Sequence, residues 1–258
     1  MKRMSDEHTQ ADLAAVWPYP RWIAHRGAGK LAPENTLAAF RLGAQHGYRM
    51  FECDAKLSRD GVPFLMHDAT LQRTTNGRGT GGDLDWSALS QLDAGGWHSR
   101  AHAGEPLPTL EALARYCIAN AYFLNIEIKP TPGQDDATGR VVAETAARLW
   151  QDQAVPPLLS SFQPVALASA RATAPQLPRA LLVDVHRQGF VDEAHGLGCV
   201  AIVCNHALWD AALVATVHGQ GMRALSYTVN DPWAVQRLIA LGTDGIITDR
   251  VDLFSPAS

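Results

Sequence analysis

Four apolar runs in the second half of the chain decide the fold: RALLVDV at 179–185, CVAIVCN at 199–205, MRALSYTVN at 222–230 and DGIITD at 244–249. Their first residues are 20, 23 and 22 positions apart. Each run is rich in aliphatic residues and short enough for a strand buried on both faces. The segments between them have room for one helix each, and PWAVQRLIALG at 232–242 shows helical spacing with a glycine stop. Alternation of strand and helix at this spacing indicates an α/β fold.

The first half of the chain adds four more runs of the same kind: RWIAH at 21–25, RMFECDAKL at 49–57, YFLNIEI at 122–128 and PLLSSF at 157–162. Eight strands alternating with helices in 258 residues predict a single (β/α)8 TIM barrel. The second and third runs start 73 residues apart, although a βαβ unit needs only about 30. We therefore expect a small inserted subdomain after the second strand, at about 62–106, beginning with a short strand in VPFLMHD and including a short helix in DWSALSQL.

Composition excludes several classes of protein and several partners. With 47% apolar and 19% charged residues, the chain is neither collagen-like nor a coiled coil nor of low complexity. The formal charge of −4 leaves no basic field for nucleic acid or an anionic membrane, so an anionic substrate needs a local site. Neither a signal peptide nor an apolar run of about 18 residues is found, so we expect a cytoplasmic protein without membrane insertion. The scattered cysteines are expected to be reduced: Cys53, Cys117, Cys199 and Cys204.

Functional residues of a TIM barrel gather at the carboxyl ends of its strands, and this chain has polar residues at those ends. Glu52 and Asp54 lie two apart on one predicted strand and therefore share a face, as do Glu127 and Lys129 on the next. Three converging carboxylates need positive charge, which a hard divalent cation (Mg²⁺, Ca²⁺ or Mn²⁺) would supply. Alternatively, Glu52 and Asp54 only neutralise Arg26 and Lys129 in a structural ion-pair network. Spacing alone leaves both alternatives open.

Two histidines stand at comparable places, and two cations accompany them. His25 follows the first strand and precedes Arg26, and His67 follows VPFLM and precedes Asp68, which could orient it. Near a metal, the two imidazoles could act as general acid and general base, although either one alone reads better as a hydrogen-bonded core histidine. Arg26 and Lys129 supply fixed positive charge for a phosphate. The set suits phosphoryl chemistry, in which charge accumulates on non-bridging oxygens.

Two sequence matches are not interpreted as functional sites. Gly77–Gly82 formally matches GxGxxG, but it follows the polar LQRTTN instead of a strand, so a mobile loop is preferred to a dinucleotide site. Ser160 and Ser161 lack the GxSxG context of a hydrolase nucleophile.

The chain resembles the glycerophosphodiester phosphodiesterases, of the bacterial cytosolic type, in blocks that span nearly its whole length. The ordered set of HRG, PENT, ExD, HD and ExK is specific, whereas any one motif is weak. The blocks, in order, are HRGAGKLAPENTLAAF (25–40), FECDAKLSRDGVPFLMHDATLQRTTNGRG (51–79), GEPLPTLEALA (104–114), NIEIKP (125–130), SFQP (161–164), SYTVND (226–231) and DGIITDR (244–250).

This resemblance implies a TIM barrel with a small insertion and assigns roles to particular residues. It implies that His25 and His67 are the catalytic acid–base pair and that Glu52, Asp54 and Glu127 bind the divalent metal. Arg26 and Lys129 would contact the phosphate, and the aromatic residues Phe162 and Tyr227 would line the glycerol side. The family usually has Trp at the position of Tyr227 and Pro near Val251, and the first difference could alter how the glycerol or alcohol end packs.

The resulting hypothesis is metal-dependent hydrolysis of a glycerophosphodiester, such as glycerophosphocholine or glycerophosphoethanolamine, to glycerol 3-phosphate and an alcohol. The rivals are a phospholipase of the same barrel type and a catalytically silent barrel that binds a phosphorylated metabolite. The sequence does not decide the preferred alcohol, the physiological metal, the acid and base roles of the histidines, a cyclic phosphate intermediate or the oligomeric state.

Overall fold

The computed structural model describes residues 17–254 and residue 256. The prediction that no signal peptide is present falls on residues 1–16 and so lies outside the described residues. In the part that is described, no helix is both long and apolar enough to cross a bilayer.

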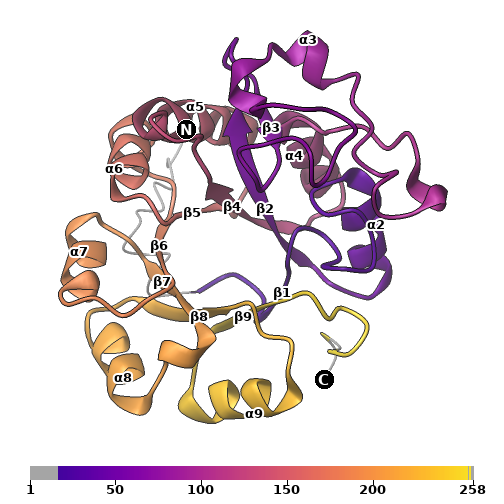
Figure 1. Ribbon diagram of the computed structural model, residues 1–258. Coiled ribbons are helices and arrows are strands. Elements are labelled where there is room, and N and C mark those ends of the chain that lie inside the picture. The colour runs from indigo at the N-terminus through magenta and orange to yellow at the C-terminus, as the bar shows by residue number, and fades with distance from the viewer. Residues whose placement is uncertain (1–16, 255, 257–258) are drawn as a thin grey trace, which may run out of the picture.

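Eight parallel strands form a closed barrel ringed by helices, as the sequence predicted (Figure 1). Each strand pairs with its neighbours along the chain, and the first pairs with both the second and the last, which closes the sheet. The barrel strands are β1 (Trp22–Ala24), β2 (Met50–Leu57), β4 (Phe123–Ile128), β5 (Leu158–Ser161), β6 (Arg179–Val183), β7 (Ala201–Asn205), β8 (Arg223–Tyr227) and β9 (Gly245–Thr248).

Several helices of the ring begin where a side chain accepts a hydrogen bond from a free backbone N–H group. Thr36, Thr109 and Asp210 each accept a hydrogen bond from a backbone N–H in the first turn of the helix that follows. The last helix ends at Gly242, the predicted stop, whose φ of 82° suits a glycine. The ring comprises α2 (Leu37–Gln45), α4 (Leu110–Ala119), α5 (Asp135–Leu149), α6 (Pro164–Thr173), α7 (Phe190–Gly196), α8 (Ala211–Gly219) and α9 (Pro232–Leu241).

Two layers of buried apolar side chains hold the barrel together. One fills the barrel interior, where Ile23, Met50 and Leu225 pack together, and the other lies between the strands and the ring of helices. Because both faces of the sheet are covered, the strands are buried almost throughout. The polar residues at the carboxyl ends of the strands meet around one end of this barrel.

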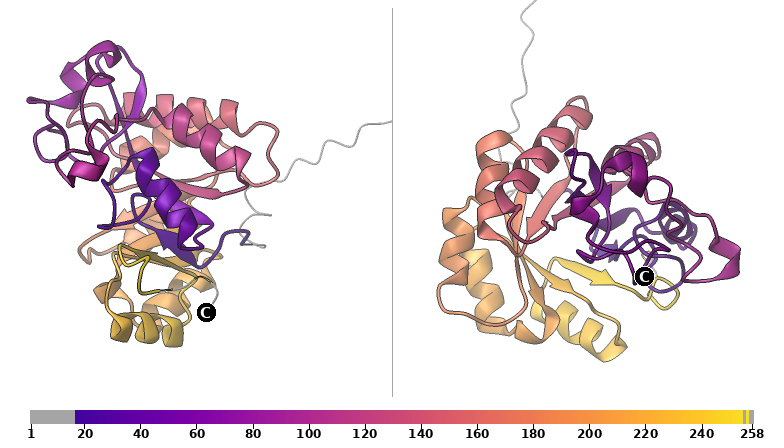
Figure 2. Two further views of the ribbon diagram at one scale, coloured as in Figure 1. Left: turned by 90° about the vertical axis from the view of Figure 1, so that its right-hand side faces the viewer. Right: turned by 45° about the horizontal axis from the view of Figure 1, so that its top comes forward.

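The segment between β2 and α4 stands outside the barrel pattern. It contains β3 (Pro63–Leu65), antiparallel to β2, the helix α3 (Trp86–Leu89) and the 3-10 turns η1 (Gly81–Asp83) and η2 (Arg100–His102). Its purple and magenta loops project beyond the ring of helices in both views of Figure 2. A separate apolar cluster that includes Phe64, Leu89 and Leu107 holds it together. We propose that this segment is the inserted subdomain expected at about 62–106.

Candidate active site

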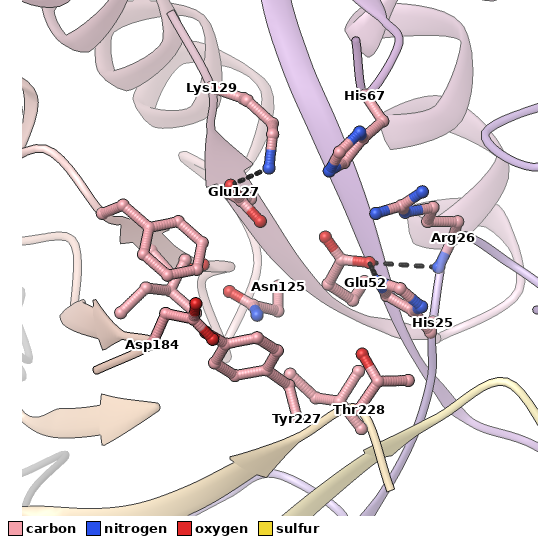
Figure 3. A pocket seen from close by; sticks show the side chains of 14 residues that line it. His25, Arg26, Glu52, His67, Asn125, Glu127, Lys129, Asp184, Tyr227 and Thr228 are labelled. Carbon is pink, nitrogen blue, oxygen red and sulfur yellow. Dashed lines mark hydrogen bonds and ion pairs between the residues drawn. The ribbon is translucent and has the colours of Figure 1, made fainter. Parts of the chain in front are cut away.

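A cavity of about 430 Å³ opens at the carboxyl ends of the barrel strands (Figure 3). Its lining includes every site residue that the sequence singled out except Asp54, which is fully buried beside Glu52 and Glu127. These side chains come from positions far apart in the chain, and barrel closure brings them together. The predicted site residues on the cavity wall are His25, Arg26, Glu52, His67, Glu127, Lys129, Phe162 and Tyr227.

The three predicted metal-binding carboxylates form one buried cluster. Glu52 and Asp54 lie on the same face of β2, and Asp54 is paired in register with Glu127 of β4. One oxygen from each of the three groups can be chosen so that all lie within 4.8 Å of one another. Their residues are at most 8% exposed. This arrangement concentrates negative charge in a place that water reaches poorly.

Burial and mutual repulsion shift the pKa values of the three carboxyl groups. Burial, followed by repulsion from Asp54 and Glu127, holds the pKa of Glu52 well above its usual range. Burial and the charge of Asp54 raise the pKa of Glu127 to about 7. Burial would also raise the pKa of Asp54, but the charges of Arg26 and Lys129 lower it below its usual range.

The donor set fits a hard divalent cation. Within residues 17–254, the buried atoms Glu52 Oε1 and Asp54 Oδ1 accept no hydrogen bond. Unpartnered buried carboxylate oxygens are costly unless a ligand or ion satisfies them. An all-oxygen set is the kind that Mg²⁺, Ca²⁺ and Mn²⁺ prefer. The cluster can therefore hold such an ion.

His25 follows β1 and is held by a carboxylate from the far end of the chain. Its Nδ1 lies 2.6 Å from Asp249 Oδ1, and its Nε2 lies 3.8 Å from Glu52 Oε2. Asp249 is fixed in turn by Asn230, whose Nδ2 donates to Asp249 Oδ2 and whose Oδ1 accepts from the Asp249 backbone N–H. The ring is thus oriented so that Nε2 faces the acidic cluster.

His67 follows β3 and is held by its neighbour in the chain. Its Nδ1 lies 2.7 Å from Asp68 Oδ1, so Asp68 is in the orienting position that the sequence suggested. Burial lowers the pKa of His67, and the charges of Arg26 and Lys129 add to that effect. A hydrogen bond from Arg73 is the first cause that lowers the pKa of Asp68 to about 2.

The two cations lie directly beside the acidic cluster. The backbone N–H of Arg26, in a residue with a φ of 51°, donates to Glu52 Oε2, and its Nε lies 3.1 Å from Asp54 Oδ2. Lys129 Nζ donates to Glu127 Oε1 at 2.7 Å and lies 3.5 Å from Asp54 Oδ1. The ion pairs of the structural alternative are therefore present, but they leave oxygens of Glu52 and Asp54 without a hydrogen bond.

Comparison with known proteins identifies the family. The family model described as "Glycerophosphoryl diester phosphodiesterase family" matches residues 25–253, which is most of the chain. The chain belongs to this family. A glycerophosphodiester phosphodiesterase of Caldanaerobacter subterraneus subsp. tengcongensis is 32% identical over 234 residues, which cover 88% of this chain and 93% of the relative.

Solved structures of phosphodiesterases share the architecture. A phosphodiesterase of Oleispira antarctica, in complex with the product sn-glycerol-3-phosphate, has 32% identity and a TM-score of 0.84, covering 92% of this chain and 95% of that one. A glycerophosphodiester phosphodiesterase of Agrobacterium tumefaciens has 28% identity and a TM-score of 0.76, covering 93% and 100%. As a member of the glycerophosphoryl diester phosphodiesterase family, the chain is an enzyme that hydrolyses phosphodiesters.

Sequence reasoning missed several residues of this phosphodiesterase cavity. Asn125 lies two residues before Glu127 on the same face of β4, so the alternation that found Glu127 and Lys129 could have found it too. Asp184 was placed inside the strand run 179–185, but β6 ends at Val183, and Asp184 turns into the cavity. Asn230 and Asp249 are the last residues of the predicted strand runs 222–230 and 244–249, and local sequence assigns neither of them a role. The other cavity residues that the sequence did not single out for the site are Ser160, Leu182, Thr228 and Ile247.

Proposed function

We propose that this enzyme hydrolyses glycerophosphodiesters such as glycerophosphocholine or glycerophosphoethanolamine to glycerol 3-phosphate and the free alcohol. One observation carries the proposal: two carboxylate-held histidines, two cations and a buried triad of carboxylates surround one cavity. Family membership supports the same reaction class. The Oleispira phosphodiesterase in complex with sn-glycerol-3-phosphate adds support, because the proposed product is the same compound.

We propose that Glu52, Asp54 and Glu127 hold one divalent cation, Mg²⁺ or Ca²⁺, with Mn²⁺ as a further candidate. When bound, such an ion polarises the phosphate oxygens and makes the attacking hydroxyl more acidic. Arg26 and Lys129 would contact the phosphate and neutralise charge that develops on its non-bridging oxygens. Phe162 and Tyr227, whose ring centroids lie 5.7 Å apart, would pack against the glycerol side of the substrate.

The histidines would move the protons. Each ring has Nδ1 engaged by a carboxylate, Asp249 for His25 and Asp68 for His67, which leaves Nε2 to exchange a proton with the substrate. One imidazole would take the proton of the nucleophile, and the other would give a proton to the departing alkoxide. A bell-shaped dependence of kcat/KM on pH is expected from such a pair.

The reaction is tested with glycerophosphocholine as substrate, with and without EDTA, and with the variants His25→Ala, His67→Ala and Glu52→Ala. We expect His25→Ala and His67→Ala each to lower kcat at least about 100-fold, the usual contribution of a general acid or base. EDTA and Glu52→Ala should lower kcat because they remove or weaken binding of the proposed cation. His218→Ala is the matched control, because His218 pairs with Asp244 and is absent from the cavity wall. Full activity in EDTA, or in both cavity histidine variants, would contradict the mechanism.

A liposome assay and a binding measurement separate this function from related ones. Hydrolysis of intact phospholipid in liposomes would favour a phospholipase, and binding without turnover would favour a silent barrel. Release of a cyclic glycerol phosphate during turnover would show that the glycerol 2-hydroxyl attacks first.

We further propose a cytoplasmic enzyme acting on small molecules. The four cysteines, which are buried and unpaired, support a reducing compartment.

A further inference from the structure

Two neutral polar side chains in the cavity have no hydrogen-bond partner. Asn125 and Ser160, here called the floor pair, are fully buried and line the cavity. Within residues 17–254, Asn125 Oδ1, Asn125 Nδ2 and Ser160 Oγ make no hydrogen bond. Buried amides and hydroxyls are costly in that state, so folded proteins satisfy most of them. A ligand that enters the cavity would supply the missing partners.

Two comparable residues of this enzyme have their hydrogen bonds. Asn35 is also a buried amide, but its Nδ2 donates to Asp54 Oδ2 and its Oδ1 accepts from the Asp54 backbone N–H. Ser161, next to Ser160 in β5, donates from Oγ to the backbone oxygen of Ile128 at 2.7 Å. The protein itself satisfies this amide and this hydroxyl, whereas it leaves the floor pair to a ligand.

The floor pair adjoins the acidic triad and reaches toward the proposed glycerol side. Asn125 is paired in register with Glu52, and Ser160 is paired with Glu127. Figure 3 shows the Asn125 amide turned away from Glu52, toward the side of the cavity on which Tyr227 lies. A substrate arm that extends from a phosphate at the triad toward the aromatic residues would therefore meet the floor pair.

The aromatic residues on that side offer ring faces to such an arm. Tyr227 Oη donates its proton to Asp184 Oδ1 at 3.0 Å, and the side chain of Phe162 has no polar atom. The carbon chain of a glycerol arm can pack against these rings, but its hydroxyl groups need donors and acceptors elsewhere. A carboxamide presents an acceptor oxygen beside two N–H donors, and a serine hydroxyl both donates and accepts. Two neighbouring hydroxyl groups match this set.

We propose that Asn125 and Ser160 bind the hydroxyl groups of the glycerol arm, so that the enzyme selects glycerol diesters over phosphodiesters with plain alkyl arms. The inference rests on the proposed function, in which the phosphate lies beside Arg26 and Lys129. A glycerol arm gives the buried amide and hydroxyl their partners, whereas an alkyl arm leaves them unpaired. The floor pair then determines specificity and does not take part in proton transfer.

The test measures the binding of two phosphate monoesters, sn-glycerol 3-phosphate and n-propyl phosphate, by isothermal titration calorimetry with Mg²⁺ present. The two ligands share the phosphate and a three-carbon chain and differ by two hydroxyl groups. We expect the wild type to bind glycerol 3-phosphate at least about tenfold more tightly than propyl phosphate. Asn125→Ala and Ser160→Ala should each reduce this preference by about threefold or more, because the affinity for propyl phosphate stays unchanged.

Ser226→Ala is the matched control for Ser160→Ala. Ser226 is also fully buried, and its hydroxyl also lacks a partner within the described residues, but it does not line the cavity. This variant should bind both ligands as the wild type does. Equal weakening of both ligands in Asn125→Ala and Ser160→Ala would overturn the proposal, because the floor pair would then hold the metal, the phosphate or the fold. An unchanged preference in both variants would overturn it as well.

Hydrolysis of glycerophosphocholine by the wild type is measured separately, because calorimetry of these ligands needs no turnover. A wild type that prefers glycerol 3-phosphate but does not hydrolyse the diester would refute the proposed function and not the role of the floor pair. A wild type that hydrolyses the diester but binds both monoesters equally would refute the role of the floor pair alone.

Discussion

Two carboxylates of different origin orient the two cavity histidines. Asp68 is the next residue after His67, whereas Asp249 is 224 positions from His25. The first partnership is visible in the sequence, because the two residues are adjacent. The second exists only because β9 pairs with β1 and places Asp249 beside His25. A remote partner of this kind cannot be read from local pattern.

Replacing Asp249 with Asn should misorient His25. The carboxylate accepts from the ring and from Asn230 on separate oxygens, and an amide has one oxygen for these two donors. We expect kcat to fall on the order of 100-fold with little change in KM, since such partners fix the tautomer and orientation of a histidine. Asp252→Asn, which removes a surface pair with Arg250, is the control and should keep full activity. A loss below threefold in Asp249→Asn would contradict this role.

Asp249 should also make stability depend on pH in the acid range. Burial would raise its pKa, but the hydrogen bond with His25 and the donor Asn230 lower it to about 2, from 3.8. Because the folded pKa lies below the unfolded one, the stabilisation is present above pH 4 and disappears as pH falls from about 4 to 2. Its size is about 2 kcal/mol. Urea unfolding at pH 7 and pH 2.5 should show a difference between wild type and Asp249→Asn that shrinks with acidification. A difference that stays constant would contradict this account.

At the scale of elements, Arg73 adds a side-chain link between the inserted segment and the barrel, beside the pairing of β3 with β2. Arg73 follows β3 and donates two hydrogen bonds to Asp68 and two to Glu34, which lies between β1 and α2. Glu34 also accepts from Arg26. Arg73 therefore joins the segment that carries His67 to the loop that carries Arg26.

Arg73→Met should loosen that junction and lower activity more than stability. We expect kcat to fall about tenfold or more, because small displacements of catalytic groups are costly, while the partly exposed ion pairs contribute little to the free energy of unfolding. Arg59→Met is the matched control, since Arg59 forms a bidentate pair with Asp85 away from the cavity. Steady-state kinetics and melting temperatures of both variants decide the matter. Equal kcat values in the two variants would contradict the role of Arg73.

Strand positions were predictable to within a few residues, whereas strand ends were not. All eight barrel strands lie inside the predicted runs, because a parallel sheet covered on both faces needs continuous apolar sequence. The run 179–185 continues two residues beyond β6, since Val185 is apolar but lies exposed in the loop after the strand. Apolar character alone therefore placed Asp184 inside a strand. The exact end of the strand decides whether such a residue faces the cavity.

For the whole molecule, closure of the barrel explains what the sequence could and could not predict about the site. Residues at the carboxyl ends of the strands gather at one end of any such barrel, so seven of the nine predicted site residues could be chosen from position and residue type, whereas Phe162 and Tyr227 were assigned only through the family resemblance. Their hydrogen-bond partners depend on which strands become neighbours when the ends of the sheet meet. The pairing of β1 with β9, and the partners Asp249 and Asn230 that it brings to His25, are therefore products of the complete fold.

The residues after β9 contribute to the same closure, which gives a prediction for the whole molecule. The ring of Phe254 stacks on Trp22 of β1 with centroids 5.3 Å apart, and its backbone oxygen accepts from Tyr48 Oη at 2.9 Å. Phe254 is 9% exposed, whereas its neighbour Leu253 is 45% exposed. Phe254→Ala should cost about 3 kcal/mol, the usual loss for a large buried aromatic residue.

In a chain of this size that loss corresponds to a melting temperature about 6–12 °C lower. Leu253→Ala should change the free energy of unfolding by less than about 0.5 kcal/mol. Because Phe254 joins the last part of the barrel to its first strand, the loss should appear as one shifted transition of the whole barrel, without a separate early step. Calorimetry of the two variants measures both quantities. Equal melting temperatures, or an early transition confined to Phe254→Ala, would show that the barrel closes without this contact.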